Sequence, residues 1–373
     1  MENKNPHVTF VMITARESFS YPEKPEMHVF EATMHCFKEQ TMKSFEVVVV
    51  DALYHKRKDY FKNLHLDFKV KHVPAQPNLW VEKGSPGICT QYNKGIIYAD
   101  GELLFFTGDS YMFRSDFMKN LWERYTQGFF PLAWYLYDHT NGGARKYHEA
   151  GTPRHVSPVP YNILGYDGQD VFVEHRYDVA FRNKREVFPA PWEWWFGCSS
   201  ASLEAMLTIN GFSMRFDGDR MLLDCDVGSR LELAGYGHHL ALFKNIFLIR
   251  IPTDASVWSS IVSKSAPSIK CQLPLIHYSR YLKRPRANTE NITEEEIKWM
   301  KEEFCVKYCH LRKTCPTEHP WQYPFEHKEG YVGHSSNKAL YEFWKNTPTI
   351  IDLREERQKR INGDQKYMEG TFT

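Results

Sequence analysis

The feature that most constrains the fold is the segment FEVVVVD at residues 45–51, which contains four consecutive valines. β-Branched residues favour a strand, and an apolar run without alternating polar positions favours a strand that is buried on both faces. Apolar, strand-like segments also occur at 8–14 and 68–73, and the residues at 27–40 have helical spacing of their apolar side chains. This strand–helix–strand–strand order predicts an α/β fold with a mostly parallel sheet.

Polar side chains stand at the carboxyl ends of three predicted strands. Thr14 ends the first, Asp51 ends the second, and Asp109 follows a later apolar strand at 103–106. Ligands of parallel α/β sheets bind where the carboxyl ends of the strands open. We therefore expect these three side chains to border a binding site. Taken alone, Asp109 is also compatible with an ordinary turn aspartate.

Composition narrows the class of protein. The 373 residues suit two domains, or one large domain with an appendage, and 42% hydrophobic with 25% charged residues is typical of a soluble globular protein. A net charge of +1 provides no overall basic field of the kind that nucleic-acid-binding proteins carry. Because no transmembrane run and no signal-like N-terminus is visible, we expect a cytoplasmic protein.

Two further segments bear on organisation. Residues 197–212 and 221–237 each carry the pattern of a helix, the second with acidic residues near its start. After residue 286 the sequence changes to charged helix and Cys/His-rich loop, so we predict a domain at 1–286 and a C-terminal accessory region at 287–373.

The accessory region contains a candidate zinc site. Its ligands are spaced C-x3-C-x5-C-x3-H, with His310 as a spare, and they are Cys305, Cys309, Cys315 and His319. Soft ligands this close together fit a structural Zn²⁺ knuckle, although the spacing is not that of a standard finger. The alternative is a loop with free thiols.

The order of motifs along residues 6–240 resembles that of GT-A-fold glycosyltransferases of family 2. The motifs are, in order, FVMITARE, FKEQTMKSFE, VVVVDA, NKGIIYADGELLFFTGD, WWFGCSSASLEAMLTINGF and LLDCDVGSR. The resemblance implies a Rossmann-like, mostly parallel sheet flanked by helices. It also implies an inverting, metal-dependent glycosyltransferase of class EC 2.4 that uses a nucleotide sugar, for which we expect a UDP-sugar.

The resemblance assigns a donor and metal site. Asp109 matches the second carboxylate of the family's Asp-x-Asp motif, which holds Mg²⁺ or Mn²⁺, whereas Thr107 replaces the first and should weaken metal binding. A late histidine often completes this site, and our candidate is His277, with His238 and His239 as alternatives. The residues expected to bind the nucleotide sugar are Thr14, Arg16, Asp51, Asn93, Lys94 and Asp109.

The resemblance also assigns a catalytic base. Asp224 matches the family's catalytic carboxylate, which takes the proton of the acceptor hydroxyl, although Leu223 replaces the family's glutamate beside it. The residues expected on the acceptor side are Trp195, Gly197, Asp226 and Arg230. Without the family context, the acidic pair is also explained as a helix N-terminus favoured by the macrodipole.

The acceptor remains open at this stage. A saccharide or lipid-linked glycan is the common acceptor of the family. Numerous aromatic residues, the basic stretch at 279–286 and the Cys/His region also suit a hydroxymethylated base in DNA, as in phage-type DNA-modifying glycosyltransferases. A second alternative is a non-catalytic sugar-nucleotide or nucleic-acid binding module. A nucleotidyltransferase is disfavoured because residues 14–21 contain no glycine. The sequence specifies neither the sugar nor the oligomeric state.

Overall fold

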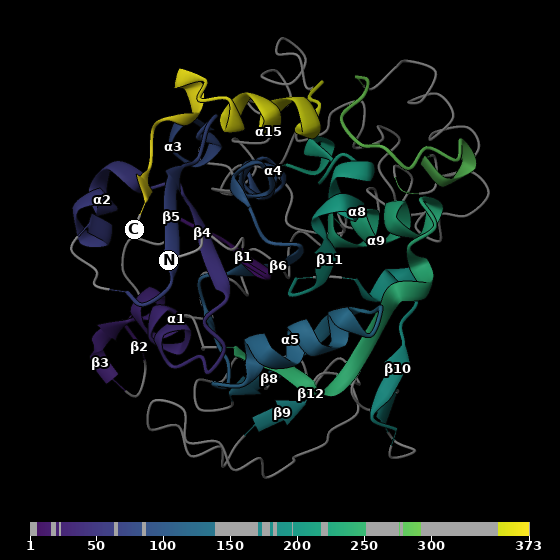
Figure 1. Cartoon of the computed structure of the whole chain (residues 1–373), viewed down its shortest axis with the longest axis horizontal. Coiled ribbons are helices and arrows are strands. Elements are labelled where there is room, and N and C mark those ends of the chain that lie inside the picture. Colours follow the sequence, from purple (N-terminus) through teal and green to yellow (C-terminus); the bar gives the residue numbers. More distant parts are fainter. Residues whose placement is uncertain are drawn as a thin grey trace, which may run out of the picture.

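Two large β-sheets with flanking helices, together with a two-stranded sheet of residues 20–21 and 24–28, form the described part of the chain (Figure 1). The structure, a computed structural model, describes residues 6–15, 20–21, 24–62, 66–83, 87–138, 171–173, 180–181, 185–195, 197–217, 223–250, 276, 279–291 and 350–372. Within these residues, no helix combines the length and the apolar character that a membrane crossing requires.

The central sheet contains the predicted parallel strands. Its order is β11-β6-β1-β4-β5-β13. The four inner strands are parallel, and they are β1 (Val8–Thr14), β4 (Phe45–Asp51), β5 (Lys69–Pro74) and β6 (Leu103–Gly108). The edge strands β11 (Ser200–Ser202) and β13 (Thr371–Phe372) run antiparallel to β6 and β5. The expectation of a mostly parallel α/β sheet is therefore confirmed.

Burial explains why these segments are strands. Every residue of β4 is buried, as expected for a β-branched run with helices on one side and a second layer on the other. Burying each valine side chain contributes about 1.5–3 kcal/mol relative to exposure. Helix α4 (Ile88–Tyr98) packs directly on β1 and β4. It approaches closely because Gly95 has no Cβ, and a Cβ there would lie 2.2 Å from Cγ1 of Val11.

The second sheet has the order β10-β12-β8-β9, with β7 paired to β12. Its strands are β7 (Tyr111–Met112), β8 (Phe130–Asp138), β9 (Val171–Val173), β10 (Val187–Pro189) and β12 (Leu240–Arg250). Strands β8 and β12 are parallel, and helix α5 (Phe117–Thr126) packs on both. Because β7 directly follows Asp109, this sheet meets the central sheet at the end of β6.

The remaining described elements are helices and short strands. They are β2 (Ser20–Tyr21), β3 (Lys24–His28), α1 (Val29–Lys38), α2 (Tyr54–Lys62), α3 (Leu79–Lys83), η1 (Trp192–Trp194), α8 (Leu203–Thr208), η2 (Met214–Phe216), α9 (Leu223–Leu233), η3 (Gly237–His239) and η5 (Gln365–Tyr367). Of these, α1 and α9 contribute side chains to the core. The predicted helix at 197–212 is wrong in its first part, because residues 200–202 form β11 at the edge of the central sheet.

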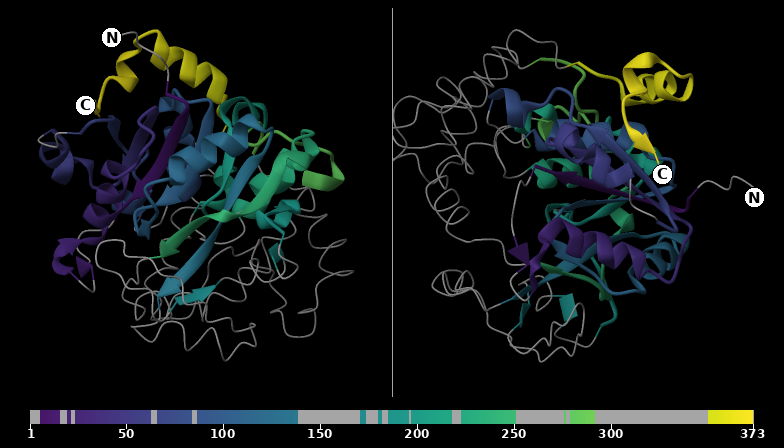
Figure 2. Two further views of the ribbon diagram at one scale, coloured as in Figure 1. Left: turned by 60° about the horizontal axis from the view of Figure 1, so that its bottom comes forward. Right: turned by 90° about the vertical axis from the view of Figure 1, so that its left-hand side faces the viewer.

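The end of the chain packs on the N-terminal part. Helix α15 (Leu353–Ile361) packs on α4, on the side of the molecule away from the second sheet (Figure 2). Arg360 contacts Asp100 at 2.7 Å. Burial alone would raise the pKa of Asp100, but Lys71 and Arg360 lower it below its ordinary value. Residues 350–372 thus belong spatially with the first predicted domain, whereas 292–349, including the candidate zinc ligands, lie outside the described residues.

Candidate active site

Three polar residues meet at the carboxyl edge of the central sheet. Thr14 lies opposite Asp51 in the β1–β4 register, and Ile13 lies opposite Gly108 in the β1–β6 register. Asp109 therefore emerges beside Thr14, and the Thr14 hydroxyl donates a 2.6 Å hydrogen bond to its Oδ2. Both side chains are buried. The strand ends thus converge as the sequence predicts.

Arg57 on α2 contacts both Thr14 and Asp51 at this edge. Its Nη1 donates to Oγ1 of Thr14 at 3.0 Å and lies 3.5 Å from Oδ2 of Asp51. Asp51 is fully buried, and its Oδ1 accepts the backbone N–H of Leu53 at 2.7 Å. The Thr14 hydroxyl is therefore a bridge between a guanidinium and the carboxylate of Asp109.

His72 on β5 provides a second, uncharged partner for Asp51. Its Nε2 lies 3.0 Å from Oδ2 of Asp51, and the ring of Phe61 stacks on it with centroids 3.8 Å apart. Burial lowers the pKa of His72, and the nearby carboxylate only partly opposes this. A neutral imidazole that donates from Nε2 to Asp51 follows.

Two nitrogen atoms of this cluster lack hydrogen-bond partners. Nη2 of Arg57 and Nδ1 of His72 are both buried and unpaired within the described residues. Nη2 of Arg57 is a donor on a charged group, and leaving it without an acceptor is costly, so it invites a ligand oxygen. Nδ1 of the neutral His72 is instead an acceptor. Counting Asp51 and Asp109 against Arg57, with His72 neutral, this cluster carries one net negative charge.

The end of β6 offers oxygen atoms of two consecutive residues to a divalent cation. Asp109 carries a carboxylate and Ser110 a hydroxyl. Mg²⁺ commonly uses one or two protein carboxylates together with substrate phosphates. Within the described part of the chain, no group of three or more His, Cys, Asp or Glu side chains is arranged to hold a metal. The protein donors suit a cation that is shared with a phosphate ligand.

The predicted histidine ligands divide into two cases. His277 lies outside the described residues. His238 and His239 form η3 at the start of β12, and Nδ1 of His239 lies 2.6 Å from the carbonyl oxygen of Gly128. The opposite end of β12 pairs with β7, next to Asp109, so the length of an 11-residue strand, about 35 Å, separates the two positions.

Asn93 and Lys94 lie on α4 with their side chains engaged by the protein. The Asn93 amide donates to the carbonyl of Phe212 and accepts its N–H, both at 2.8 Å. Lys94 donates to Oε1 of Gln76 at 3.1 Å, and burial lowers its pKa to about 8. Asn93 thus anchors the turn after α8, and the predicted donor-binding roles of both residues remain predictions.

The acidic residues of α9 have different surroundings. Oδ2 of Asp226 accepts from Nε of Arg230 at 2.7 Å, and both side chains are buried. Asp224 is partly exposed in the first turn. Burial raises the pKa of the Cys198 thiol to about 12, and the charge of Asp224 adds to that rise. Cys198 Sγ lies 3.6 Å from Oγ1 of Thr107 on β6.

The predicted acceptor wall is mostly interior. Trp195 is 1% exposed, and its indole N–H donates to the carbonyl of Ser200 at 3.0 Å. Gly197 has φ +50°, and a Cβ there would lie 2.1 Å from the Tyr135 hydroxyl. The partly exposed rings of this stretch are Trp192 and Trp194. The acceptor roles of Trp195 and Gly197 remain predictions, and Arg16 lies outside the described residues.

The sequence did not reveal the residues that contact Thr14, Asp51 and Asp109. Arg57 and His72 are among them, as is Thr33, whose hydroxyl donates to the Asp109 carbonyl at 3.1 Å. No motif marks them, because the packing of α1 and α2 on the sheet brings Thr33 and Arg57 to the strand ends, and the β4–β5 register places His72 there. The one available signal was a basic helix directly after the Asp51 strand.

Comparisons with known proteins do not extend this description. No protein-family model matches the chain, and no curated protein sequence matches it. Among solved structures, it is similar to S. aureus TarS, with a TM-score of 0.45 and 11% identity over 95% of this chain and 53% of that one. A structure of TarS 1–349 gives a TM-score of 0.41 and 11% identity over 96% and 92%. The chain thus spans about half the length of the longer TarS chain.

Proposed function

We propose that the chain is a glycosyltransferase that moves a sugar from a nucleotide sugar to an acceptor hydroxyl. The observation that carries the proposal is the Thr14–Asp109 hydrogen bond at the carboxyl edge of the sheet. It joins the first and fourth of the six motifs whose order resembles family 2. The charge of Asp224, in the sixth motif, contributes to the raised pKa of Cys198, and Cys198 contacts Thr107 in the fourth motif.

The donor in this proposal is a UDP-sugar bound at the ends of β1 and β4. Arg57 supplies a buried positive charge beside Thr14, and its unpaired Nη2 can donate to an oxygen of the donor. Asp51 already accepts hydrogen bonds from Leu53 and His72 and forms an ion pair with Arg57, so its remaining acceptor capacity is small. We therefore assign a contact with the base to Asp51, and a further contact, with the base or with the phosphates, to Arg57.

Asp109 is the proposed protein ligand of Mg²⁺ or Mn²⁺. When bound, the cation would neutralise charge on the departing diphosphate. Thr14 orients the Asp109 carboxylate by its hydrogen bond at Oδ2. Thr107 takes no part, because its hydroxyl is buried and directed to the Gly108 carbonyl and to Cys198.

Asp224 is the proposed general base of an inverting transfer. The acceptor oxygen forms a bond to the anomeric carbon while the bond from that carbon to the diphosphate oxygen breaks on the opposite face. The acceptor proton passes to a carboxylate oxygen of Asp224. Its partial exposure suits this role, since acceptor and solvent can reach it. Asp226 cannot do the same, because Arg230 holds it in a buried ion pair.

A saccharide is the proposed acceptor, and modified DNA is the alternative outcome. The basic stretch at 279–286 carries less free charge than its sequence suggests. Arg280 pairs with Glu232, and Arg286 pairs with Asp352. These pairs reduce the electrostatic attraction that a DNA backbone requires. A structural zinc ion at 305–319 remains a separate proposal, since those residues lie outside the described ones.

An assay of UDP release with a panel of UDP-sugars tests the proposal. We expect slow release without acceptor and faster release with a suitable saccharide. Oligonucleotides with cytosine or 5-hydroxymethylcytosine form the DNA arm. Binding of UDP without any release from any UDP-sugar would instead favour the non-catalytic binding module. Absence of both binding and release would refute the proposal.

A further inference from the structure

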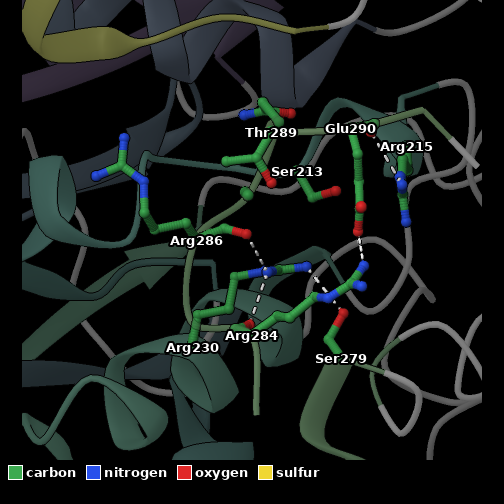
Figure 3. A pocket seen from close by; sticks show the side chains of 10 residues that line it. Ser213, Arg215, Arg230, Ser279, Arg284, Arg286, Thr289 and Glu290 are labelled. Carbon is green, nitrogen blue, oxygen red and sulfur yellow. Dashed lines mark hydrogen bonds and ion pairs between the residues drawn. The ribbon is translucent and has the colours of Figure 1, made fainter. Parts of the chain in front are cut away.

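A pocket lies beside α9, outside the strand-end site. Its cavity volume is about 20 Å³, and it is partly open to solvent. Figure 3 shows that three segments contribute to it: the turn at η2, helix α9 and the segment at 279–290. Its polar lining is rich in hydrogen-bond donors, and these are Ser213, Arg215, Arg230, Ser279, Arg284, Arg286 and Thr289. Glu290 is the single acidic residue of the lining.

The wall of the pocket is built before any ligand arrives. Nη1 of Arg230 donates to the carbonyls of Arg284 and Arg286 at 3.2 and 3.0 Å, and Nη2 donates to Oγ of Ser279 at 3.1 Å. Oδ2 of Asp226 accepts a hydrogen bond from Nε of the same guanidinium. Arg230 is therefore a fixed support of the segment, and little ordering entropy would be lost on binding.

A second clamp fixes the opposite side. The Asn288 amide donates to the Phe212 carbonyl at 2.8 Å and accepts the N–H of Met214 at 2.9 Å. Ser213 lies between these two anchored residues. Its side chain is 2% exposed and lines the pocket, so its hydroxyl can donate to a ligand that brings an acceptor oxygen there.

The mouth of the pocket already contains one negatively charged side chain, that of Glu290. Figure 3 shows the Glu290 carboxylate directed toward the Arg284 guanidinium, with which it forms an ion pair, near the Ser213 side chain. The side chains of Arg284 and Glu290 are 45% and 38% exposed, so their mutual attraction is weak and easily exchanged. Arg215 reaches the same residue by donating to the Glu290 carbonyl at 3.0 Å.

We propose that this pocket binds a phosphate group, with Arg284 and Ser213 as donors and with the Glu290 carboxylate displaced. A guanidinium presents paired N–H groups that match phosphate oxygens, and a tetrahedral phosphate can accept from a hydroxyl on another side at the same time. The lining otherwise offers mainly donors, which suits an anion and disfavours a cation. Phosphate binding here does not depend on the proposed transfer reaction.

The position of the pocket suggests the source of the phosphate. Arg230 in its wall and Asp224, the proposed base, lie on the same helix, six residues apart, which is about 9 Å along the axis. If the transfer reaction proposed above is correct, a phosphate at this distance belongs to the acceptor. A phosphorylated saccharide could then place its hydroxyl at Asp224 while its phosphate lies in the pocket.

Calorimetric titration with inorganic phosphate tests the binding. Arg284→Gln and Ser213→Ala should each weaken it about tenfold or more, because a charge-assisted and a buried hydrogen bond are lost. Glu290→Gln should strengthen it, because the competing carboxylate is removed. Lys283→Gln is the matched control, since Lys283 is exposed in the same segment and is not part of the lining, and it should leave the affinity unchanged.

A second variant distinguishes the pocket from the strand-end site. If Arg57→Met abolishes phosphate binding while Arg284→Gln does not, phosphate occupies the strand-end site and the proposal is wrong. Equal affinities of wild type, Arg284→Gln and Glu290→Gln would also overturn it. Titrations with glucose 6-phosphate and with glucose then identify the source of the phosphate. A phosphorylated saccharide is supported if glucose 6-phosphate binds more tightly than inorganic phosphate and glucose does not bind. Failure of the UDP-release assay would leave these results untouched.

Discussion

Thr14 and Asp109, ninety-five residues apart in the sequence, are joined by a 2.6 Å hydrogen bond between buried side chains. The bond links the first strand of the central sheet to the point at which the chain leaves for the second sheet. Because Arg57 donates to the same Thr14 hydroxyl, the carboxylate, hydroxyl and guanidinium form one connected unit. Substitutions at these positions should therefore affect ligand binding before they affect the fold.

Asp109→Ala should abolish sugar transfer, since it removes the proposed ligand of the metal. Thr107→Ala should cost far less, because that hydroxyl faces Gly108 and Cys198 and is a poor metal ligand. UDP release measured across a Mn²⁺ titration checks both. Asp116→Ala, which removes a partly exposed carboxylate just after β7, is the control and should behave as wild type. Full activity of Asp109→Ala in the presence of a chelator would contradict the metal assignment.

Asp224→Asn should lower the turnover number by about 10²–10⁴, because the general base is lost while the shape is kept. Affinity for UDP should stay unchanged, since the residue is assigned to the acceptor and not to the nucleotide. Asp226→Asn tests a different property, because it leaves the buried Arg230 charge without its counter-ion. It should reduce the free energy of unfolding by about 3–5 kcal/mol, and its activity should fall only as folded protein is lost. Near-normal turnover of Asp224→Asn would show that another group is the base.

Arg57→Met should weaken UDP binding by about tenfold or more, because a charged hydrogen-bond donor at the strand ends is removed. Calorimetric titration with UDP and with uridine separates two possibilities. Loss for UDP alone would place Arg57 at the phosphates, and loss for both would place it at the nucleoside. Lys56→Met on the same helix removes an exposed charge and serves as the control. Unaltered UDP affinity in Arg57→Met would exclude Arg57 from the donor site.

Lys94 should make stability depend on pH. Its pKa of about 8 in the folded chain lies below the ordinary 10.5, so the folded state releases this proton first. The free energy of unfolding should therefore gain a contribution as the pH rises from about 8 to about 10.5, and lose it as the pH falls from about 10.5 to about 8. Lys94→Met should be more stable than wild type at pH 7, by on the order of 3 kcal/mol. Urea unfolding of both proteins from about pH 7 to about pH 10 should show this difference shrinking.

The cysteines of the C-terminal region yield an independent prediction. If Cys305, Cys309, Cys315 and His319 hold zinc, metal analysis of the purified protein should find about one Zn²⁺ per chain. Cys309→Ser should then lower the metal content and the stability of that region. A metal-free protein whose Cys309→Ser variant melts at the same temperature would make these residues ordinary thiols.

The central sheet was predictable because its signals are local. The valine run of β4 and the apolar end of β6 are strands in almost any context, and parallel order aligns their carboxyl ends. The start of α8 was not predictable in this way. Residues 200–202 carry a helix-like pattern, but they pair with the edge of β6, and Ser202 then accepts the N–H of Ala205 as the helix N-cap. Residues 200–202 form a strand and not a helix because the edge of β6 is available for pairing.

In the candidate site, too, some residues could be predicted from the sequence and others could not. Thr14, Asp51 and Asp109 end their own strands, so each is visible from its flanking residues. His72 lies within a strand, and Arg57 lies on a helix whose apolar pattern is weak. Their position beside Asp51 depends on the β4–β5 register and on how α2 packs, and neither is encoded in a short motif. Trp195 illustrates the converse, since an aromatic-rich stretch does not reveal which of its rings is buried.

Strand β13 has a consequence for the synthesis of the chain. Thr371 pairs with His72, about 300 residues earlier, and so covers the outer edge of β5. At the ribosome's usual rate of about 5–20 residues per second, roughly 15–60 s pass between the emergence of β5 and that of its edge partner. During this interval the nascent chain exposes an unpaired strand edge, which is a template for intermolecular pairing. A chaperone that binds extended segments would find its target there until residue 371 arrives.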